Sequence, residues 1–413
     1  MPTFASSDRA QLAYIPEVSF GVTPGTGNGY NLRMTGESLG FNLTKTADKE
    51  IAADAQPTSM VTTNAQASGD IKVHMQYAEY DRLLAATLRS AWAAFGTNGV
   101  GAPFVGTVTA GTLGTVASTI TASVATSGTS LFTTLQPGQW FKLAMPTNAN
   151  DGKWVRNSLT VPATSTVITL DVWTPLVVAT SIAASTISTS RCTNGVLQTS
   201  FTIEQQAADV SQVFTFRGMY PSKFSTAFTA AQLTEATFSF MGKASTRQAA
   251  TMLPGATAAS QTYDIHNGVA GVGTLWEGGA PLTSTSIKSI TMDIDSNLRA
   301  QEALGTLGLV GVGIGTISVK GNLEVYFADG TQYDKFLADT YTSLILSTKD
   351  AAGNGYVITI PKVMLTSAKI DAGSKNSDLM ASFQYEALAD RGNAVAALQK
   401  TIIIDRVGAA VTP

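Results

Sequence analysis

Charged residues are scarce in this sequence. Only 13% of its 413 residues are Asp, Glu, Lys or Arg, about half the share that is usual for soluble domains. The formal net charge of −3 leaves no basic excess, which argues against tight binding to nucleic acid. Abundant Thr, Ser, Ala and Gly instead indicate β-rich surfaces, many of them buried against other subunits.

Disulfides, membrane-spanning runs and a secretory leader are also lacking. Cys192 is the single cysteine, which excludes an internal disulfide framework and fits folding in a reducing cytoplasm. The longest apolar run, residues 304–317, contains five glycines and is too short to cross a bilayer. The first twenty residues include Asp8, Arg9 and Glu17 and no apolar core of a signal peptide. We therefore predict no membrane partner.

No constellation of catalytic or metal-binding residues is found. His74 and His266 have no Cys or acidic residue at metal-ligand spacing, so a surface or interface position is expected for both. Residues 293–297 begin like a calcium loop, but Leu298 and Leu304 stand where that loop requires Gly and Glu. We predict no catalytic residue, no metal and no cofactor.

One eight-residue stretch occurs twice in the chain. Residues 80–87 (YDRLLAAT) return as residues 333–340 (YDKFLADT), with five of the eight positions identical. In both copies the apolar residues fall at helical spacing, which predicts a short helix that closes the end of a small β-barrel, with its Asp favoured by the helix dipole. The motif residues are Tyr80, Asp81, Leu84, Tyr333, Asp334 and Leu337.

A strand is expected before each copy of this helix. Residues 70–77 alternate between apolar and polar side chains, and so do residues 317–327, which is typical of a strand with one buried face. The same strand-then-helix unit therefore occurs once in each half of the chain. We interpret it as an internal duplication.

Length and composition predict several domains. The region that follows the first helix is low in charge and has short β-like runs separated by turns, which indicates an inserted sandwich or barrel. In chain order we expect an irregular N-terminal arm (1–35), a first β-domain in two segments (36–96 and 197–247) around the insertion (97–196), a connector (248–284), a second β-domain (285–407) and a C-terminal tail (408–413).

Several segments together resemble the major tail tube proteins of long-tailed, siphovirus-type bacteriophages. The resemblance covers most of the chain outside the insertion and depends on the order of the segments. They are residues 20–24 (FGVTP), 36–39 (GESL), 80–84 (YDRLL), 200–204 (SFTIE), 216–218 (FRG) and 238–242 (FSFMG).

The resemblance implies an all-β fold with short flanking helices, in which two tandem tube-type β-sandwich or barrel domains carry an inserted small β-domain. It also implies a structural virion protein and not an enzyme, assembled in the host cytoplasm and located in the virion tail. Such a protein polymerises into stacked rings that form a conduit for DNA ejection. Its partners would be copies of itself, the tape measure and terminator proteins at the tube ends, and DNA that passes without tight binding.

The resemblance further implies rings of six units, so two units in each chain predict a trimer with pseudo-sixfold symmetry. Six units of about four strands give about 24 strands, and at ~4.8 Å between strands the perimeter is ~115 Å and the diameter ~37 Å. Barrels of about 16 to 18 strands already leave an aqueous channel, so this ring would be wide enough for a duplex.

The lining of such a channel should not hold phosphate groups, because each cationic contact adds affinity for DNA. Residues 44–56 and 293–304 both carry an acidic excess, which suggests that they line the lumen or lie between rings. That they are ordinary solvated loops stays open as an alternative. The candidate residues are Asp48, Glu50, Asp54, Asp293, Asp295 and Glu302.

A second class of function also stays open. Trp140, Trp154 and Trp173 lie in the inserted region, as expected for a β-rich adhesin or a carbohydrate-binding surface protein that acts through this domain. A β-rich hydrolase is disfavoured, because no pair of carboxylates stands in a recognisable context.

Overall fold

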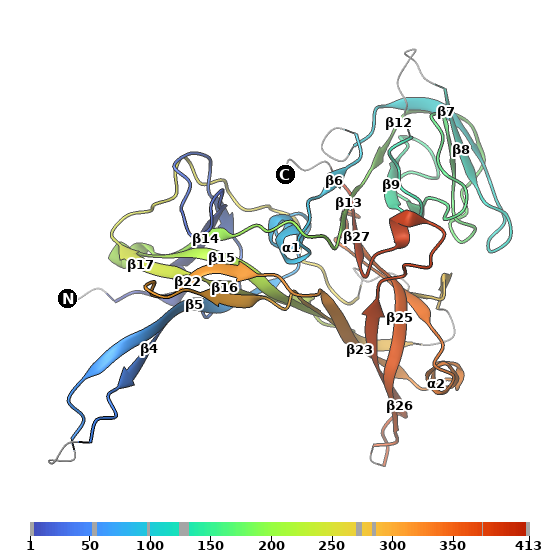
Figure 1. The fold of residues 1–413 in the computed structure, drawn as a ribbon. Coiled ribbons are helices and arrows are strands. Elements are labelled where there is room, and N and C mark those ends of the chain that lie inside the picture. The colour runs from blue at the N-terminus through green and yellow to red at the C-terminus, as the bar shows by residue number, and fades with distance from the viewer. Residues whose placement is uncertain are drawn as a thin grey trace.

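The computed structural model describes residues 4–51, 56–96, 100–123, 132–269, 275–282, 286–373 and 375–409. Most of these residues that are in regular elements lie in β-strands, which confirms the expected all-β class (Figure 1). The two expected helices are present as α1 (Asp81–Thr87) and α2 (Thr331–Leu337). Over the described ranges, no helix has the length and apolar character needed to cross a membrane.

One antiparallel sheet runs through both halves of the molecule outside the inserted region (Figure 1). One edge is formed by two strands that pair with β5 in the same register from Gly36 to Thr44. In spatial order its strands are β3 (Gly36–Glu37) with β4 (Gly40–Ala47), β5 (Met60–His74), β16 (Glu235–Gly242), β15 (Gln212–Thr229), β20 (Ile287–Asp295), β23 (Ser318–Tyr326), β26 (Met380–Leu388) and β25 (Gly355–Asp371). The sheet stays open and does not close into a barrel.

The two halves of this sheet have the same strand order. Each half places its strands in the chain order first, second, fourth, third: β3/β4–β5–β16–β15 and then β20–β23–β26–β25. The third strand of each half is long and has a register shift of one residue against its neighbour, at Ser222 in β15 and at Thr366 in β25. Both second strands carry a glycine at the matching place, Gly69 and Gly321.

Beyond the register shift, each long strand continues into a second sheet above the first. The alternating apolar residues of the two sheets face each other, which is why a single core fills the space between them. The first upper sheet is β2 (Tyr30–Leu32), β1 (Ala10–Pro16), β14 (Phe201–Ala207), β15 and β17 (Ala244–Gln248). The second is β19 (Ala280–Pro281), β18 (Trp276–Glu277), β24 (Thr342–Lys349), β25, β27 (Ile403–Val407), β13 (Ser190–Thr193) and β6 (Ala93–Ala94).

Three expectations are corrected by this arrangement. The N-terminal arm is not irregular throughout, because β1 and β2 lie within residues 1–35 and residues 12–15 are buried. No barrel end is closed by the repeated helix; α1 instead packs on β15. His266 is not at the surface, since it is fully buried with its Nδ1 atom 3.1 Å from Thr348 Oγ1.

Two hairpins extend from corresponding places in the two halves, each between the first and second strands. The β4–β5 hairpin projects away from the body of the molecule (Figure 1). The shorter hairpin of β21 (Arg299–Glu302) and β22 (Leu309–Gly313) lies against it, with Asn64 Nδ2 donating a hydrogen bond to Glu302 Oε1 at 2.7 Å.

The inserted region forms a separate six-stranded sheet with its own apolar core. It begins after β6 and ends before β13, and these two strands pair with each other, so the insertion leaves and rejoins the main fold at one point. Its strands, in spatial order, are β10 (Trp154–Arg156), β9 (Trp140–Ala144), β12 (Ala179–Ser188), β7 (Phe104–Thr109), β8 (Thr119–Ser123) and β11 (Val167–Thr169).

The tryptophans of the insertion face the second half of the molecule. Trp140 is buried edge-on against Trp276, with 5.2 Å between ring centroids. Trp154 Nε1 donates a hydrogen bond to the carbonyl of Gly353 at 3.1 Å. Trp173 packs partly buried against the same cluster. These contacts hold the insertion in place.

Candidate functional site

The main sheet ends in an open strand edge at each side of the molecule. Residues 36–42 pair with β5 on one side, and no described strand pairs with their other side. Residues 364–371 of β25 pair with β26 on one side and likewise have no strand on the other within the described ranges. Open edges present backbone N–H and C=O groups to another strand, so both are candidate assembly surfaces.

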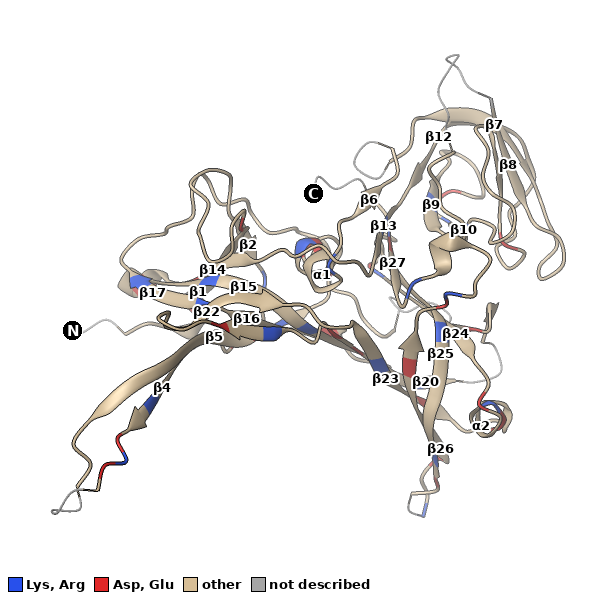
Figure 2. Ribbon diagram, viewed as in Figure 1, with Lys and Arg blue, Asp and Glu red and all other residues tan. Residues whose placement is uncertain are grey.

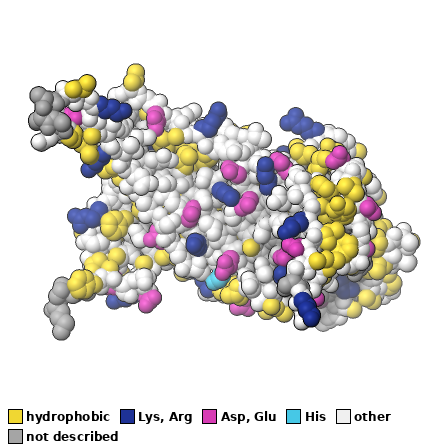
Figure 3. Space-filling model, turned by 90° about the horizontal axis from the view of Figure 1, so that it is seen from below, with side chains coloured by type: hydrophobic (Ala, Val, Ile, Leu, Met, Phe, Trp, Pro, Cys, Tyr) yellow, Lys and Arg dark blue, Asp and Glu magenta, His cyan; other side chains and the backbone are white. Residues whose placement is uncertain are grey.

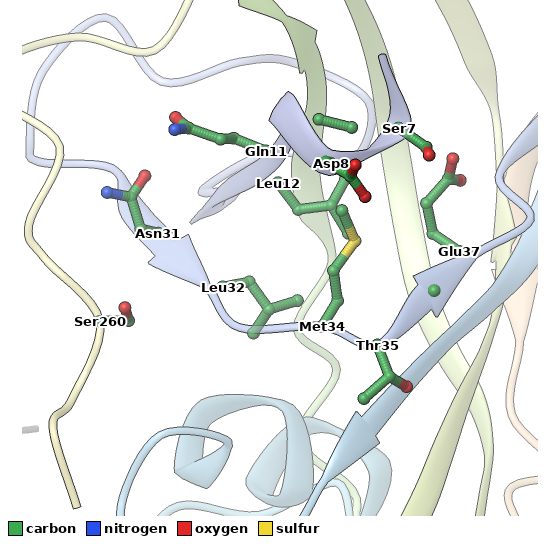
Figure 4. A pocket seen from close by; sticks show the side chains of 12 residues that line it. Ser7, Asp8, Gln11, Leu12, Asn31, Leu32, Met34, Thr35, Glu37 and Ser260 are labelled. Atoms are coloured by element: carbon green, nitrogen blue, oxygen red, sulfur yellow. The ribbon is translucent and has the colours of Figure 1, made fainter.

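Apolar side chains are exposed along both open edges. Phe41 is 37% exposed and Ile370 38% exposed, and both point to the side of the sheet that elsewhere carries the core. The pocket in Figure 4, of about 650 Å³, lies directly beside the first edge and is lined by Met34, Gly36 and Glu37 together with residues of β1 and β2. Among the described residues no group of three or more His, Cys, Asp or Glu side chains is placed to hold a metal ion.

The two copies of the helix motif differ sharply in burial. Tyr80 and Leu84 are buried in the main core. Asp81 is buried too, where it accepts hydrogen bonds from the Tyr356 hydroxyl at 2.6 Å and from the Arg406 guanidinium. Burial and the neighbouring Asp81 charge raise the pKa of Tyr356 well above its usual value, so its hydroxyl remains a donor.

In the second copy the corresponding side chains are less buried. Tyr333 is half-buried, Asp334 is exposed and Leu337 is 63% exposed, against 2% for Leu84. Tyr341, which matches the fully buried Leu88, is 52% exposed. The surface of α2 therefore lacks the cover that the second half of the chain gives to α1.

The lower face of the main sheet is polar and carries charges of both signs (Figures 2 and 3). Asp293 and Asp295 lie here on β20, next to the centre of the sheet. Three lysines of this face are paired with carboxylates: Lys223 with Asp293 at 3.2 Å, Lys320 with Glu386 at 3.3 Å and Lys288 with Glu324 at 3.1 Å. Cations that are already paired have less charge available for a phosphate.

The other candidate acidic residues do not join Asp293 and Asp295. Asp48 and Glu50 lie toward the tip of the β4–β5 hairpin, and Glu302 lies on β21; Asp54 falls outside the described residues. Hydrogen bonds from Thr58 and Ser59 hold the pKa of Asp48 below its ordinary value. The six acids are thus divided between the polar sheet face and two hairpins.

Sequence reasoning did not identify the second edge, residues 364–371, or the partners of Asp81. Tyr356 and Arg406 follow Asp81 by 275 and 325 positions, so no local pattern connects them. The similar spacing of aromatic residues in 236–242 and 381–387, the fourth strand of each half, is a sign within the sequence of the common strand order.

Comparison with known proteins agrees with this architecture. No curated protein matches the chain significantly. The family model for the phage tail tube protein matches residues 7–387, which includes both open edges, the polar face and the insertion. Because the match extends over nearly the whole chain, this protein belongs to the phage tail tube protein family.

Proposed function

We propose that this chain builds the tail tube of a siphovirus-type phage by joining open sheet edges into closed rings. The observation that carries the proposal is the main sheet, with two halves of equal strand order and one unfilled edge at each end. The equal order supports an internal duplication, and three chains would then supply six units and about 24 strands to one ring. We propose the domain boundaries given above for these units, except that the insertion ends before β13 and that β1 and β2 belong to the first unit.

The polar face of the sheet lines the lumen of this ring. Three of its lysines are paired with nearby carboxylates, which leaves fewer free cations to hold a passing duplex by its phosphates. Asp293 and Asp295 lie within this lining. The channel conducts DNA into the host during ejection.

The projecting β4–β5 hairpin connects one ring to the next. It extends well beyond the body of the chain, and its outer part is exposed, including Val61 at 62%. Asp48, Glu50 and Asp54 belong to this inter-ring segment, and Glu302 contacts its base through Asn64. At the ends of the tube the same surfaces meet the terminator and other tail proteins. Assembly takes place in the host cytoplasm.

Electron microscopy of the purified protein tests the assembly. Hollow rings or tubes with threefold symmetry are expected. Sixfold rings with one chain per unit would show that a ring contains six chains and not three. Compact monomers at high protein concentration would contradict tube formation.

The lumen assignment has its own test. Asp70 lies on the same polar face, on β5 opposite Ser239. Phage carrying Asp70→Lys, Asp293→Lys and Asp295→Lys together should release DNA more slowly, because three added cations bind passing phosphates. The matched Asn substitutions at the same positions remove the charge without adding a cation, and should release DNA at nearly the normal rate. Equal release kinetics in the Lys and Asn variants would contradict the lumen assignment.

A further inference from the structure

We propose that β25 of one subunit pairs with the β3–β4 edge of the next subunit in the register of the internal β15–β20 junction. The inference rests on the proposed ring assembly and specifies how its subunits meet. Each chain already contains one junction between two halves of equal strand order. That junction is therefore a template for the contact between chains.

The register shifts align the two long strands. Ser222 is the extra residue of β15 against β16, and Thr366 is the extra residue of β25 against β26. Lys223 in the first half therefore matches Ser367 in the second. Phe238, opposite Phe224 in the first half, matches Phe383, which lies opposite Ala368.

The two glycines align the edge strands. Gly40 pairs with Ser68, the residue before Gly69, and Asp293 pairs with Lys320, the residue before Gly321. Gly40 at the open edge therefore matches Asp293 at the internal junction. Both alignments are fixed by pairings within one chain, and they leave one register for the contact between chains.

Transfer of the β15–β20 register gives the pairs between subunits. The internal pair Lys223 with Asp295 becomes Ser367 with Asn42, and Ser225 with Asp293 becomes Lys369 with Gly40. The next pair on the same polar face is Asp371 with Ser38. No like charges come face to face, which would be destabilising directly across two strands.

The alternate pairs place apolar side chains together. Phe41 comes opposite Ala368, and Leu39 comes opposite Ile370, on the side of the sheet that carries the core. At the internal β15–β20 junction the corresponding pairs are Ile294 with Phe224 and Met292 with Thr226, and all four side chains are buried. The exposure of Phe41 and Ile370 in the single chain is thus removed when the edge is filled.

Backbone hydrogen bonds follow from the same template. Ser296 donates to the carbonyl of Ser222, and Ala230 donates to that of Lys288, both at 2.9 Å. In an antiparallel pair of strands, every second pair of opposite residues forms backbone hydrogen bonds to each other. Between chains, the apolar pairs therefore form these hydrogen bonds and the polar pairs do not. At the open edge, the Leu39 N–H donates to the Glu37 carboxylate at 2.7 Å. When the partner strand binds, the Leu39 N–H has to exchange the Glu37 carboxylate for a backbone carbonyl of that strand.

The surface of α2 gives an independent indication of the same partner. Helix α1 spans the internal junction, where Ser296 Oγ donates to the carbonyl of Thr87 at 2.9 Å. Leu43 holds the place of Ser296 at the open edge and is 47% exposed. The transferred geometry brings Leu43 to the end of α2, where Leu337 and Tyr341 are exposed.

Paired cysteines test the register in assembled tubes. Asn42→Cys with Ser367→Cys joins a polar pair without mutual hydrogen bonds, in which Cα atoms are about 4.5 Å apart and suit a disulfide. The native Cys192 is buried, so the introduced thiols are the reactive ones. After oxidation, denaturing gels should show covalent multimers whose ladder ends at the number of chains in the ring, three.

The control is Asn42→Cys with Lys369→Cys, which places the thiols on a diagonal about 7–8 Å apart, beyond the reach of a disulfide. Cross-linking of the control to an equal or greater extent would overturn the register. Failure of both pairs to cross-link in well-formed tubes would overturn the edge contact while the tube function stands. Absence of tubes from the unmodified protein would instead contradict the proposed function.

Hydrogen exchange of the unmodified chain tests the same contact if the cysteine variants do not assemble. The amides of Phe41 and Ala368 should exchange at least about tenfold more slowly in tubes than in the unassembled chain, because each gains a partner. Ser38 already donates to the Asp70 carbonyl at 2.9 Å, and should change less. Unchanged exchange at Phe41 and Ala368 would overturn the proposal.

Discussion

The two copies of the helix motif have similar sequences but different surroundings. Asp81 is enclosed by Tyr356 and Arg406 from the other half of the chain, whereas Asp334 faces solvent. Leu84 is 2% exposed and Leu337 is 63% exposed. The motif thus specifies a helix in both places, and burial depends on whether the next half of the sheet belongs to the same chain.

The comparison extends to the strands beside the helices. At the internal junction β20 fills the edge of β15, and Ile294 is fully buried. At the open edge the matching residue, Phe41, is 37% exposed. The second half therefore resembles the first with its neighbour removed.

The largest difference between the copies is expected for the aspartates. Asp81→Asn leaves the buried Arg406 guanidinium without its counter-charge, which should cost about 3–5 kcal/mol of unfolding free energy. Asp334→Asn, at an exposed position, should change it by less than about 0.5 kcal/mol. Urea unfolding of the unassembled chain measures both. Similar losses in the two variants would show that the copies are not distinguished by burial.

The leucines separate folding from assembly. Leu84→Ala should destabilise the free chain by about 2–5 kcal/mol, because it opens a cavity in the main core. Leu337→Ala should alter the stability of the free chain by less than about 0.5 kcal/mol, yet it should raise the protein concentration needed for tube formation. Unchanged assembly of the Leu337 variant would mean that α2 stays uncovered in the tube.

Acid should weaken the contact between the halves. Burial lowers the pKa of His266 to about 4, although the nearby Asp350 charge opposes this shift. The unfolded chain, with an ordinary histidine pKa of about 6.5, therefore binds a proton that the folded chain does not, and stability falls as the pH is lowered from about 6.5 to 4. The loss should reach about 3 kcal/mol at most.

Replacement of the imidazole tests this assignment. Denaturant unfolding measured between pH 7 and pH 4 should show a shallower decline for His266→Gln than for the unmodified chain. Parallel curves for the two proteins would place the acid sensitivity elsewhere in the molecule.

Local patterns predicted the elements but not their surroundings. Alternation in 70–77 and 317–327 and the repeated helix spacing gave the strand-then-helix units, because these depend on residues close in sequence. β1 was missed, since its short apolar run ends at Pro16 and resembles an irregular arm. In the proposed ring Leu337 and Ile370 are covered by a second chain, and no periodicity within one sequence contains that information.

The smallest effect is expected for the ion pair at the internal junction. Lys223 and Asp293 are 3.2 Å apart, and their side chains are 41% and 45% exposed, so solvent screens most of their attraction. The matching residues at the open edge, Ser367 and Gly40, carry no charge. The contact between chains therefore has to form without an ion pair at this place. We expect that the internal junction can also form without the pair of Lys223 and Asp293.

Asp293→Asn should accordingly cost no more than about 0.5 kcal/mol of unfolding free energy in low salt and leave tube formation unchanged. High salt should remove even this difference, because it screens exposed pairs. Asp295→Asn, whose side chain lies on the same strand and face, is the matched control. A loss above about 1 kcal/mol for Asp293→Asn alone would show that charge holds the internal register. The junction within the chain would then differ in kind from the junction between chains, and its register would no longer serve as the template.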